Sequence, residues 1–229
     1  GRVAVKVRFG GGRRAFAPGE AAYAALGDLA LVSSGEATLG QNELDRITTG
    51  RKIGFDFSID DAAFRFSGDT RAADLGDQLY LFAAKLAFPR WDENPVLRAK
   101  AAALMQYDTY AVSPQGILQR DLEYYQRGRD PRFASPDPTA LDKVTPAGFR
   151  AVWERVLASG PIEVQVYGDV DRQGTIDALA RTFGALEKRP PLSAAVQTAA
   201  LGSPAPSATP VVLRHRGDAD QAAAVMSWN

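Results

Sequence analysis

The sequence predicts an α+β fold, in which an antiparallel or mixed β-sheet is covered by α-helices. Residues 53–66 alternate apolar and polar side chains on both sides of a short Asp-Asp turn, which is typical of a β-hairpin. Most helical patterns lie together between this hairpin and a last strand that begins near residue 162. Because strands and helices do not alternate strictly, the Rossmann and TIM-barrel folds are disfavoured.

The first elements are a strand and two helices. Apolar side chains occupy every second position over residues 3–9, so we expect a strand with one solvent-facing side. Residues 18–20 open a nearly all-apolar helix up to Val32, which we expect to be buried on most sides. Gly35 ends this helix, and residues 42–49 are predicted to form a short second one.

The middle of the chain predicts the hairpin and then a series of helices. The two strands cover residues 53–59 and 64–66. Thr70 has the hydroxyl of an N-cap residue, and apolar positions at steps of three and four predict a helix from there to Leu86. The remaining predicted elements are helices over residues 94–110, 114–127, 145–158 and 176–183, a surface loop over 128–138 and a strand over 162–166.

The composition along the chain suggests its domain organisation. We expect residues 1–186 to form one α+β domain. Residues 187–209 are dominated by proline, alanine and serine with little periodicity, which is typical of a linker. Residues 210–229 show strand patterns over 211–213 and 222–228, and we expect them to begin a following domain. Both ends of the sequence look cut from a longer polypeptide.

The composition also restricts the classes of function. Lys and Arg together number 27, as do Asp and Glu, so no net charge attracts nucleic acid or an anionic membrane. No cysteine is present, which excludes disulfides, thiolate zinc sites and cysteine nucleophiles. The longest apolar run, residues 21–32, is too short to span a bilayer, so no membrane insertion is expected. A chain without cysteine fits a periplasmic or otherwise exported location, and it fits the cytoplasm as well.

Common catalytic motifs have little support in this sequence. His215 is the only histidine, and a Ser-His-Asp arrangement would require it to fold onto a distant serine such as Ser58 or Ser113. We expect instead an exposed histidine at a strand edge. The three glycines at 10–12 lack the Gly-Lys-Ser/Thr continuation of a phosphate-binding loop, so we expect them to end the first strand.

Charged and aromatic residues cluster at a few places without forming a recognisable site. The adjacent carboxylates at 60–61 and 92–93 point to different sides of their elements, which makes them poor acid/base pairs. Basic residues crowd the loop that follows the helix at 114–127, and either a solvated loop or a contact with an acidic substrate or partner domain would explain them. These residues are Arg127, Arg129 and Arg132. Four tyrosines at helical spacing indicate packing rather than a stacking platform, namely Tyr107, Tyr110, Tyr124 and Tyr125.

The order of elements resembles that of the M16 family of zinc peptidases, the insulinase or pitrilysin-like enzymes. The most specific motif is Gly-Asp-Val-Asp at 168–171 after a strand, with Phe-Gly-Ala-Leu downstream at 183–186. Residues 141–145 followed by Phe149 look like the family's entry to the next helix, and the loop at 128–133 is similar to its Gly-x-His-Pro-Tyr element. At Gly-Asp-Val-Asp we expect a structural role, in which an aspartate caps the following helix.

Catalytic M16 domains bind zinc through His-x-x-Glu-His on the first long helix, together with a glutamate further along. Placing Gly35 on the family's glycine puts Leu26-Gly27-Asp28-Leu29-Ala30 at that motif, where no histidine is present. Residues 98–103, where the third ligand would lie, hold no carboxylate. The resemblance therefore implies a domain with no catalytic and no metal-binding residues, and it leaves the substrate-binding residues unknown.

By this resemblance the chain is the first domain of the zinc-free, C-terminal half of an M16 peptidase. It implies a domain that forms chamber wall and contacts a peptide substrate opposite a zinc-bearing half, in the same polypeptide or in a partner chain. Zinc is expected as a cofactor only in that half, so this chain is expected to be inactive alone. The alternatives are a catalytically dead M16-like scaffold or assembly subunit, and an unrelated α+β ligand-binding domain.

Overall fold

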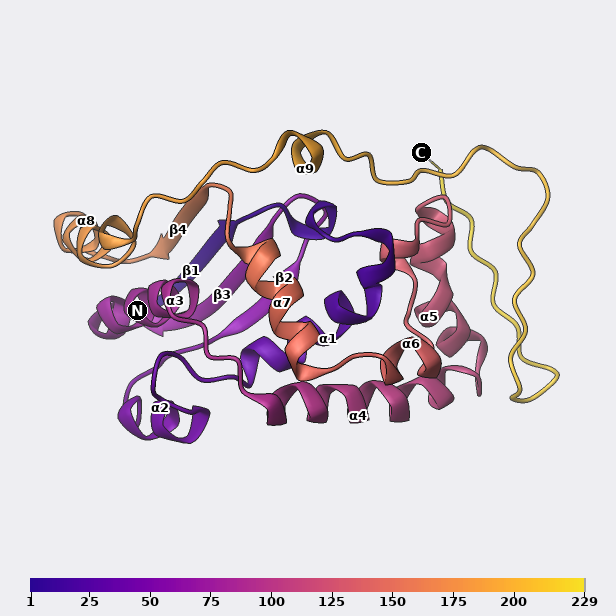
Figure 1. Cartoon of the computed structure of the whole chain (residues 1–229), viewed down its shortest axis with the longest axis horizontal. Coiled ribbons are helices and arrows are strands. Elements are labelled where there is room, and N and C mark those ends of the chain that lie inside the picture. The colour runs from indigo at the N-terminus through magenta and orange to yellow at the C-terminus, as the bar shows by residue number, and fades with distance from the viewer. Residues whose placement is uncertain (229) are drawn as a thin grey trace.

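The computed structural model describes residues 1–228 and confirms the predicted α+β fold. One antiparallel sheet has the strand order β2-β3-β1-β4. Its strands are β1 Arg2–Phe9, β2 Asp56–Ile59, β3 Phe64–Arg71 and β4 Ile162–Gly168. The helices within the described residues are α1 Ala21–Val32, α2 Gln41–Ile47, α3 Leu75–Ala87, α4 Glu93–Tyr110, α5 Pro114–Gln126, α6 Pro138–Asp142, α7 Pro146–Leu157, α8 Arg172–Arg181 and α9 Ala194–Thr198 (Figure 1).

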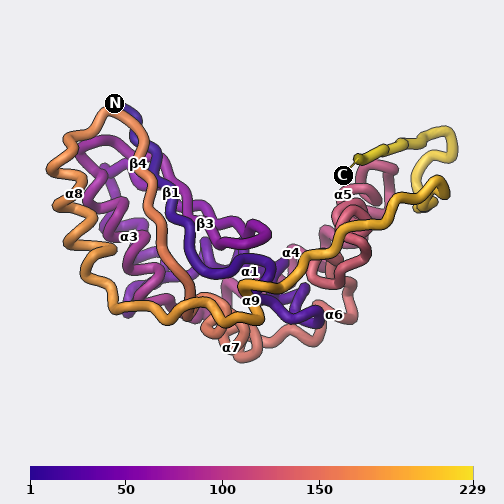
Figure 2. Tube along the Cα trace, turned by 90° about the horizontal axis from the view of Figure 1, so that it is seen from above, coloured from indigo at the N-terminus to yellow at the C-terminus, as the bar shows by residue number. Residues whose placement is uncertain are grey.

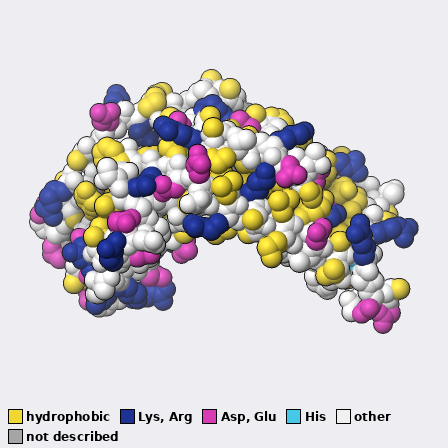
Figure 3. Space-filling model, turned by 60° about the horizontal axis from the view of Figure 1, so that its bottom comes forward, with side chains coloured by type: hydrophobic (Ala, Val, Ile, Leu, Met, Phe, Trp, Pro, Cys, Tyr) yellow, Lys and Arg dark blue, Asp and Glu magenta, His cyan; other side chains and the backbone are white. Residues whose placement is uncertain are grey.

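Helices cover one face of the sheet and leave the other open. Val3, Val5 and Val7 of β1 are buried beneath the helix layer, as their alternation predicts. Lys6 and Arg8, on the opposite face, are exposed. Figure 2 shows α3 and α8 together on one side of the sheet, while α4 and α5 lead away from it towards the C-terminal segment. The molecule is therefore a crescent. On the face seen in Figure 3, charged side chains of both signs are interspersed.

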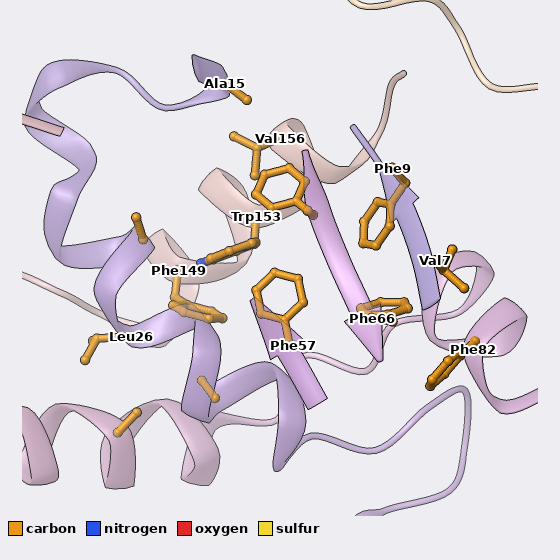
Figure 4. Close-up of a cluster of buried hydrophobic side chains, with 14 of the residues drawn as sticks. Val7, Phe9, Ala15, Leu26, Phe57, Phe66, Phe82, Phe149, Trp153 and Val156 are labelled. Carbon is orange, nitrogen blue, oxygen red and sulfur yellow. The ribbon is translucent and has the colours of Figure 1, made fainter. Parts of the chain in front are cut away.

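A cluster of aromatic side chains fills the space between the sheet and the helices (Figure 4). Trp153 of α7 lies at its centre and is fully buried. Its ring centroid is 5.2 Å from that of Phe16, 5.6 Å from those of Phe57 and Phe64, and 5.9 Å from that of Phe149. These edge and tilted contacts join the strands of the hairpin to α7, and they make one continuous core.

Two helix starts follow the capping chemistry that the sequence indicates. The Thr145 hydroxyl accepts a hydrogen bond from the backbone N–H of Gly148 at 3.0 Å. The Asp171 carboxylate accepts one from Gly174, so the aspartate of Gly-Asp-Val-Asp caps α8 as predicted. Thr70 was predicted to cap a helix, and that prediction is wrong. It lies in β3, which continues to Arg71, and its hydroxyl donates to a backbone carbonyl in the segment before β2.

The first strand of the hairpin is shorter than predicted, because a side chain replaces part of the ladder. Only Asp56–Ile59 pairs with β3, although the alternation begins at residue 53. The backbone N–H and C=O of Gly54 bond instead to the side-chain amide of Gln78, both at 2.9 Å. Gln78 is buried on α3, so the backbone of Gly54 is bound to a helix side chain and not to the strand ladder.

The last part of the described chain departs most from the sequence-based expectation. The segment predicted as a linker contains α9, and residues 199–228 contain no helix or strand. The strands predicted at 211–213 and 222–228 are therefore not formed, since a strand needs a neighbour for its backbone groups and most of these residues are exposed. The domain boundaries at residues 186 and 209 stay predictions.

Candidate functional site

The middle turn of α1 contains Leu26–Ala30, the residues that the resemblance places at the zinc-binding motif of the M16 family. Leu26 and Ala30 are 1% and 0% exposed and face the core, whereas Leu29 is 48% exposed and Asp28 is also at the surface. Ala25, Asp28 and Leu29 form an open face at spacings of three and four, which the all-apolar composition hid. The other nine residues of α1 are buried or half-buried, so the expectation that α1 is buried on most sides is confirmed.

Gly27 in the same turn is covered by the indole of Trp153. A Cβ atom added to Gly27 would lie 1.9 Å from Cζ2 of Trp153, so only glycine leaves room for the ring. The indole Nε1 donates a hydrogen bond of 3.0 Å to the carbonyl oxygen of Tyr23, one turn earlier in α1. Packing and hydrogen bonding together fix α7 against this turn.

The residues around this turn do not fit a zinc ion. Structural and catalytic zinc sites use at least three nitrogen, oxygen or sulfur ligands, and Leu26–Ala30 offers only the carboxylate of Asp28. Burial, and to a smaller extent the neighbouring carboxylate of Asp56, raises the pKa of Asp28. On α4, which packs against α1, Ala99 is buried and supplies no ligand. Across residues 1–228 no group of three histidine, cysteine or carboxylate side chains is placed to hold a metal.

A buried lysine and a buried glutamate near the end of α1 were not predicted. Lys85 of α3 and Glu36 are 8% and 5% exposed. The Lys85 ammonium donates to the carbonyl oxygen of Ser34, and it lies 5.0 Å from the ring centroid of Phe55. Burial lowers the pKa of Lys85 to about 8, although the Glu36 carboxylate opposes this. Burial likewise raises the pKa of Glu36, and the Lys85 charge partly offsets it.

This pair lies within a set of hydrogen bonds that ends α1. The backbone N–H of Ala37 donates to the carbonyl of Phe88 at 2.8 Å, and the N–H of Gly35 to the Asp92 carboxylate at 3.3 Å. Arg90 donates to the carbonyl of Thr38 at 2.8 Å. The segment after α1 is therefore fastened to the segment after α3. The only signal in the sequence was Lys85 itself, which lies among apolar residues of the predicted helix and directly before Leu86, one of its apolar positions at steps of three and four.

No protein-family profile and no curated protein matches this chain. Among solved structures, the periplasmic protease PqqL from Escherichia coli matches with a TM-score of 0.69 at 18% identity, over 89% of this chain and 22% of that chain. A protease from Helicobacter pylori matches with a TM-score of 0.65 at 19% identity, over 90% of this chain and 48% of that chain. The M16 peptidase inactive domain from Pseudomonas fluorescens matches with a TM-score of 0.65 at 17% identity, over 89% and 48%.

The chain has the fold of an M16 peptidase domain. The chain spans about a fifth of the PqqL chain and about half of each of the other two. Each of the three matches covers most of this chain, and one of the matched structures is described as an inactive domain. At this level of identity the similarity establishes the fold of the chain alone. This is the fold that the sequence motifs indicated.

The basic loop that follows α5 is held by carboxylates. Arg127 forms an ion pair of 2.9 Å with Asp61 of the hairpin turn, and Arg132 forms one of 2.6 Å with Asp130. The guanidinium carbon of Arg127 also lies 4.8 Å from the ring centroid of Phe133. The loop therefore packs onto the hairpin, and two of its three arginines are paired rather than free for an acidic ligand.

The other residues considered from the sequence do not assemble into a catalytic site. The ring nitrogens of His215 bond at 3.0 and 3.1 Å to the backbone of Gln221 and Gly217, and neither Ser58 nor Ser113 is among its partners. His215 is half-buried in an irregular segment rather than exposed at a strand edge. Gly12, with φ of +57°, contacts the hairpin turn, which accords with the predicted strand end. The four tyrosines are half-buried, as packing residues are.

Two open grooves and the length of the helices complete the description. One groove of about 700 Å³ lies between α5 and residues 201–203 and 227–228. A second, of about 800 Å³ and mainly apolar, adjoins the first residue of β4. Among the described helices, none combines the length and the apolar character needed to cross a membrane.

The contact between Gly27 and Trp153 predicts a position-specific effect of alanine. Gly27→Ala should lower the free energy of unfolding by about 3 kcal/mol, because the added methyl group overlaps the indole. The matched control is Gly76→Ala in α3, where an added Cβ meets nothing within 4 Å and should stabilise by up to about 1 kcal/mol. Urea unfolding followed by circular dichroism measures both. Equal effects of the two changes would contradict the proposed contact.

Restoring the family's motif should not create a zinc site. Leu26→His, Leu29→Glu and Ala30→His together should lower stability by about 4 kcal/mol or more, because both imidazoles would enter the core. Zinc content after dialysis should stay below one ion per chain. Leu29→Glu alone is the control, and it should change stability by less than about 0.5 kcal/mol. A folded triple variant that holds one zinc ion would show this orientation of α1 to be incorrect.

The burial of Lys85 predicts how stability depends on pH. Because burial lowers the pKa of Lys85 from 10.5 to about 8, the unfolded chain binds a proton between these values that the folded chain has released. The free energy of unfolding should therefore rise with pH over this window, by up to about 3 kcal/mol more in the wild type than in Lys85→Met. Urea titrations at pH 7.5, 9 and 10.5 would measure the difference, and parallel pH profiles would refute it.

Proposed function

We propose that this chain is a non-catalytic domain of an M16-type zinc metalloendopeptidase. The observation that carries the proposal is the middle turn of α1, where Trp153 covers Gly27 and the positions of Leu26 and Ala30 are part of the core. A domain with this fold and without ligands on this helix serves the peptidase by its surface rather than by chemistry. We place it in the chamber wall, in contact with the peptide and opposite the zinc-bearing half.

The comparison of two matches to one protease supports a position in the zinc-free, C-terminal half. The match to the full PqqL chain has a TM-score of 0.69 over 89% of this chain. The match to the first half of the same protease has a TM-score of 0.63 over 84%. The higher TM-score with the whole protease is expected if this chain resembles a domain outside the first half of PqqL more than a domain within it. The zinc-bearing half would then be part of the same polypeptide or a partner chain, and it alone would hold the metal.

The open face of the sheet supports the surface role. Lys6, Arg8, Glu163 and Tyr167 project from it into solvent, and no helix of the described chain covers them. The crescent shape in Figure 2 turns this side towards the concave part of the molecule. A periplasmic location is proposed on two grounds, the absence of cysteine and the likeness to a protease described as periplasmic.

Zinc analysis and peptide cleavage test this function. The purified chain alone should hold less than one zinc ion per molecule and should cleave none of a library of unstructured peptides. Mixed with the zinc-bearing half of its own system, it should form a complex that cleaves peptides faster than that half does alone. A stable complex without faster cleavage would favour the scaffold alternative. Zinc-dependent cleavage by the isolated chain would overturn the proposal.

A further inference from the structure

We propose that the apolar groove beside the start of β4 binds a medium-chain aliphatic carboxylate, with its carboxylate on the guanidinium of Arg189 and its hydrocarbon chain along the groove. The proposal concerns a small-molecule site and goes beyond the peptidase role, since it needs neither zinc nor a partner half. Either proposal can therefore fail without the other.

The groove lies where the chain that follows α8 passes the start of β4 on its way to α9 (Figure 1). It has a volume of about 800 Å³, which is within the range of small-ligand sites. Its apolar lining residues are Pro161, Ile162, Phe183, Leu186, Pro190, Pro191 and Leu192. A hydrocarbon chain that lies on this surface is removed from water, and that removal favours binding.

The wall of the groove is held by hydrogen bonds to neighbouring backbone. The N–H of Gly160 donates to the carbonyl oxygen of Pro190 at 2.9 Å. The side-chain amide of Gln197 in α9 donates to the carbonyl oxygen of Leu192 at 2.6 Å. Residues 190–197 are therefore fastened beside the start of β4, and the groove is largely formed before a ligand arrives.

Arg189 brings a positive charge to this apolar surface. Its Nε donates to the carbonyl oxygen of Gly160 at 3.1 Å, and its Nη2 donates to those of Leu157 and Ser159. These bonds hold the guanidinium at the C-terminal end of α7, where the backbone carbonyls favour a cation. Among the described residues Nη1 has no hydrogen-bond partner, so it can donate to a ligand.

The charge of Arg189 has no counter-ion within the described chain. Arg120, Arg127 and Arg132 are also part-buried, and each has an aspartate oxygen within 2.9 Å. In residues 1–228 no aspartate or glutamate forms an ion pair with Arg189. Burial lowers the pKa of the Arg189 guanidinium, and no neighbouring carboxylate opposes this shift. An anion that binds here would pair a cation that is otherwise costly to bury.

The charges around the groove favour a ligand with a single negative charge. Glu187 and Lys188 at its rim are exposed and carry opposite charges, so Arg189 gives the lining its net positive charge. The guanidinium is surrounded by three carbonyl oxygens and has one nitrogen left to donate. A phosphate dianion would bring further negative charge next to these oxygens, whereas a carboxylate needs only the one cation.

The lining favours a hydrocarbon chain over the carboxyl terminus of a polypeptide. Three of its residues are prolines, which have no N–H to offer a peptide backbone. The N–H of Gly160 and the amide of Gln197 already donate to other carbonyls. A polypeptide terminus would leave its own amide groups unpaired on an apolar surface, which costs free energy. An aliphatic carboxylate has no such groups.

The probe is sodium decanoate, added to the full 229-residue chain with carbon-13 in its isoleucine and leucine methyl groups. The methyl shifts of Ile162, Leu186 and Leu192 locate the site and give the dissociation constant, which should be about 1 mM or below. Decylammonium has the same length and the opposite charge, and it should bind at least about tenfold more weakly. Acetate, which lacks the hydrocarbon chain, should cause no saturable shift.

Three results would overturn the proposal. The first is equal affinity for decanoate and decylammonium, which would show apolar adsorption without recognition of charge. The second is the absence of a saturable shift at these methyl groups up to about 10 mM decanoate. The third is tighter binding of an acetylated peptide that ends in leucine, which would identify a polypeptide terminus as the occupant.

Variants of Arg189 test the recognition of charge. Arg189→Met keeps a long side chain without the charge, and it should weaken decanoate binding at least about tenfold. Arg189→Lys keeps the charge and should retain most of the affinity. The matched control is Arg181→Met, which removes an exposed arginine from α8 outside the groove and should leave the affinity unchanged.

A second variant is needed because Arg189 also holds the end of α7. Leu186→Glu leaves Arg189 in place and puts a carboxylate in the lining of the groove. It should weaken decanoate binding about tenfold, since the new carboxylate competes for the same cation. Circular dichroism confirms that each variant is folded. Unchanged affinity in folded Leu186→Glu and Arg189→Met would show that the groove is not the site.

Discussion

The contact of Trp153 with Gly27 is the constraint on which the rest of the domain depends. The indole joins α7 to α1 and to the phenylalanines of the hairpin strands, so it connects elements from both ends of the domain. Its space exists only because residue 27 has no side chain. Dense aromatic packing of this kind tolerates little change in volume, and the orientation of α1 follows from it.

That orientation does not suit a metal site on this helix. A catalytic zinc ion needs ligands that face an open space for water and substrate. With the indole over Gly27, the positions of Leu26 and Ala30 turn into the core, and the open face shows Asp28 and Leu29 instead. The missing histidines and the packing of α7 are therefore two aspects of one arrangement. Supplying the side chains without moving Trp153 would bury them.

Local patterns in the sequence predicted most of the fold, and the errors have a common physical cause. Strand β1, the hairpin and the long helices follow from periodicity, and the caps at Thr145 and Asp171 follow from side-chain chemistry. Thr70 was misplaced because β3 runs past Gly68, whose missing side chain lets the backbone of Gly54 approach. Contacts between distant segments of this kind leave no local signal. The motif comparison predicted that ligands are absent, but the direction in which the helix faces required the structure.

The buried side chains of Lys85 and Glu36 belong to the contacts that hold the interior of the domain together, on the side of the sheet that the helices cover. Burying ionisable side chains is costly and is weak evidence for stability, so the role of Lys85 is better sought in the geometry that it imposes. Its ammonium donates to the carbonyl of Ser34, and with the hydrogen bonds around it this contact holds the end of α1 against α3. These interior constraints act on the face of the sheet that the helices cover. The open face of the sheet takes no part in them, so its residues can change without loss of the core.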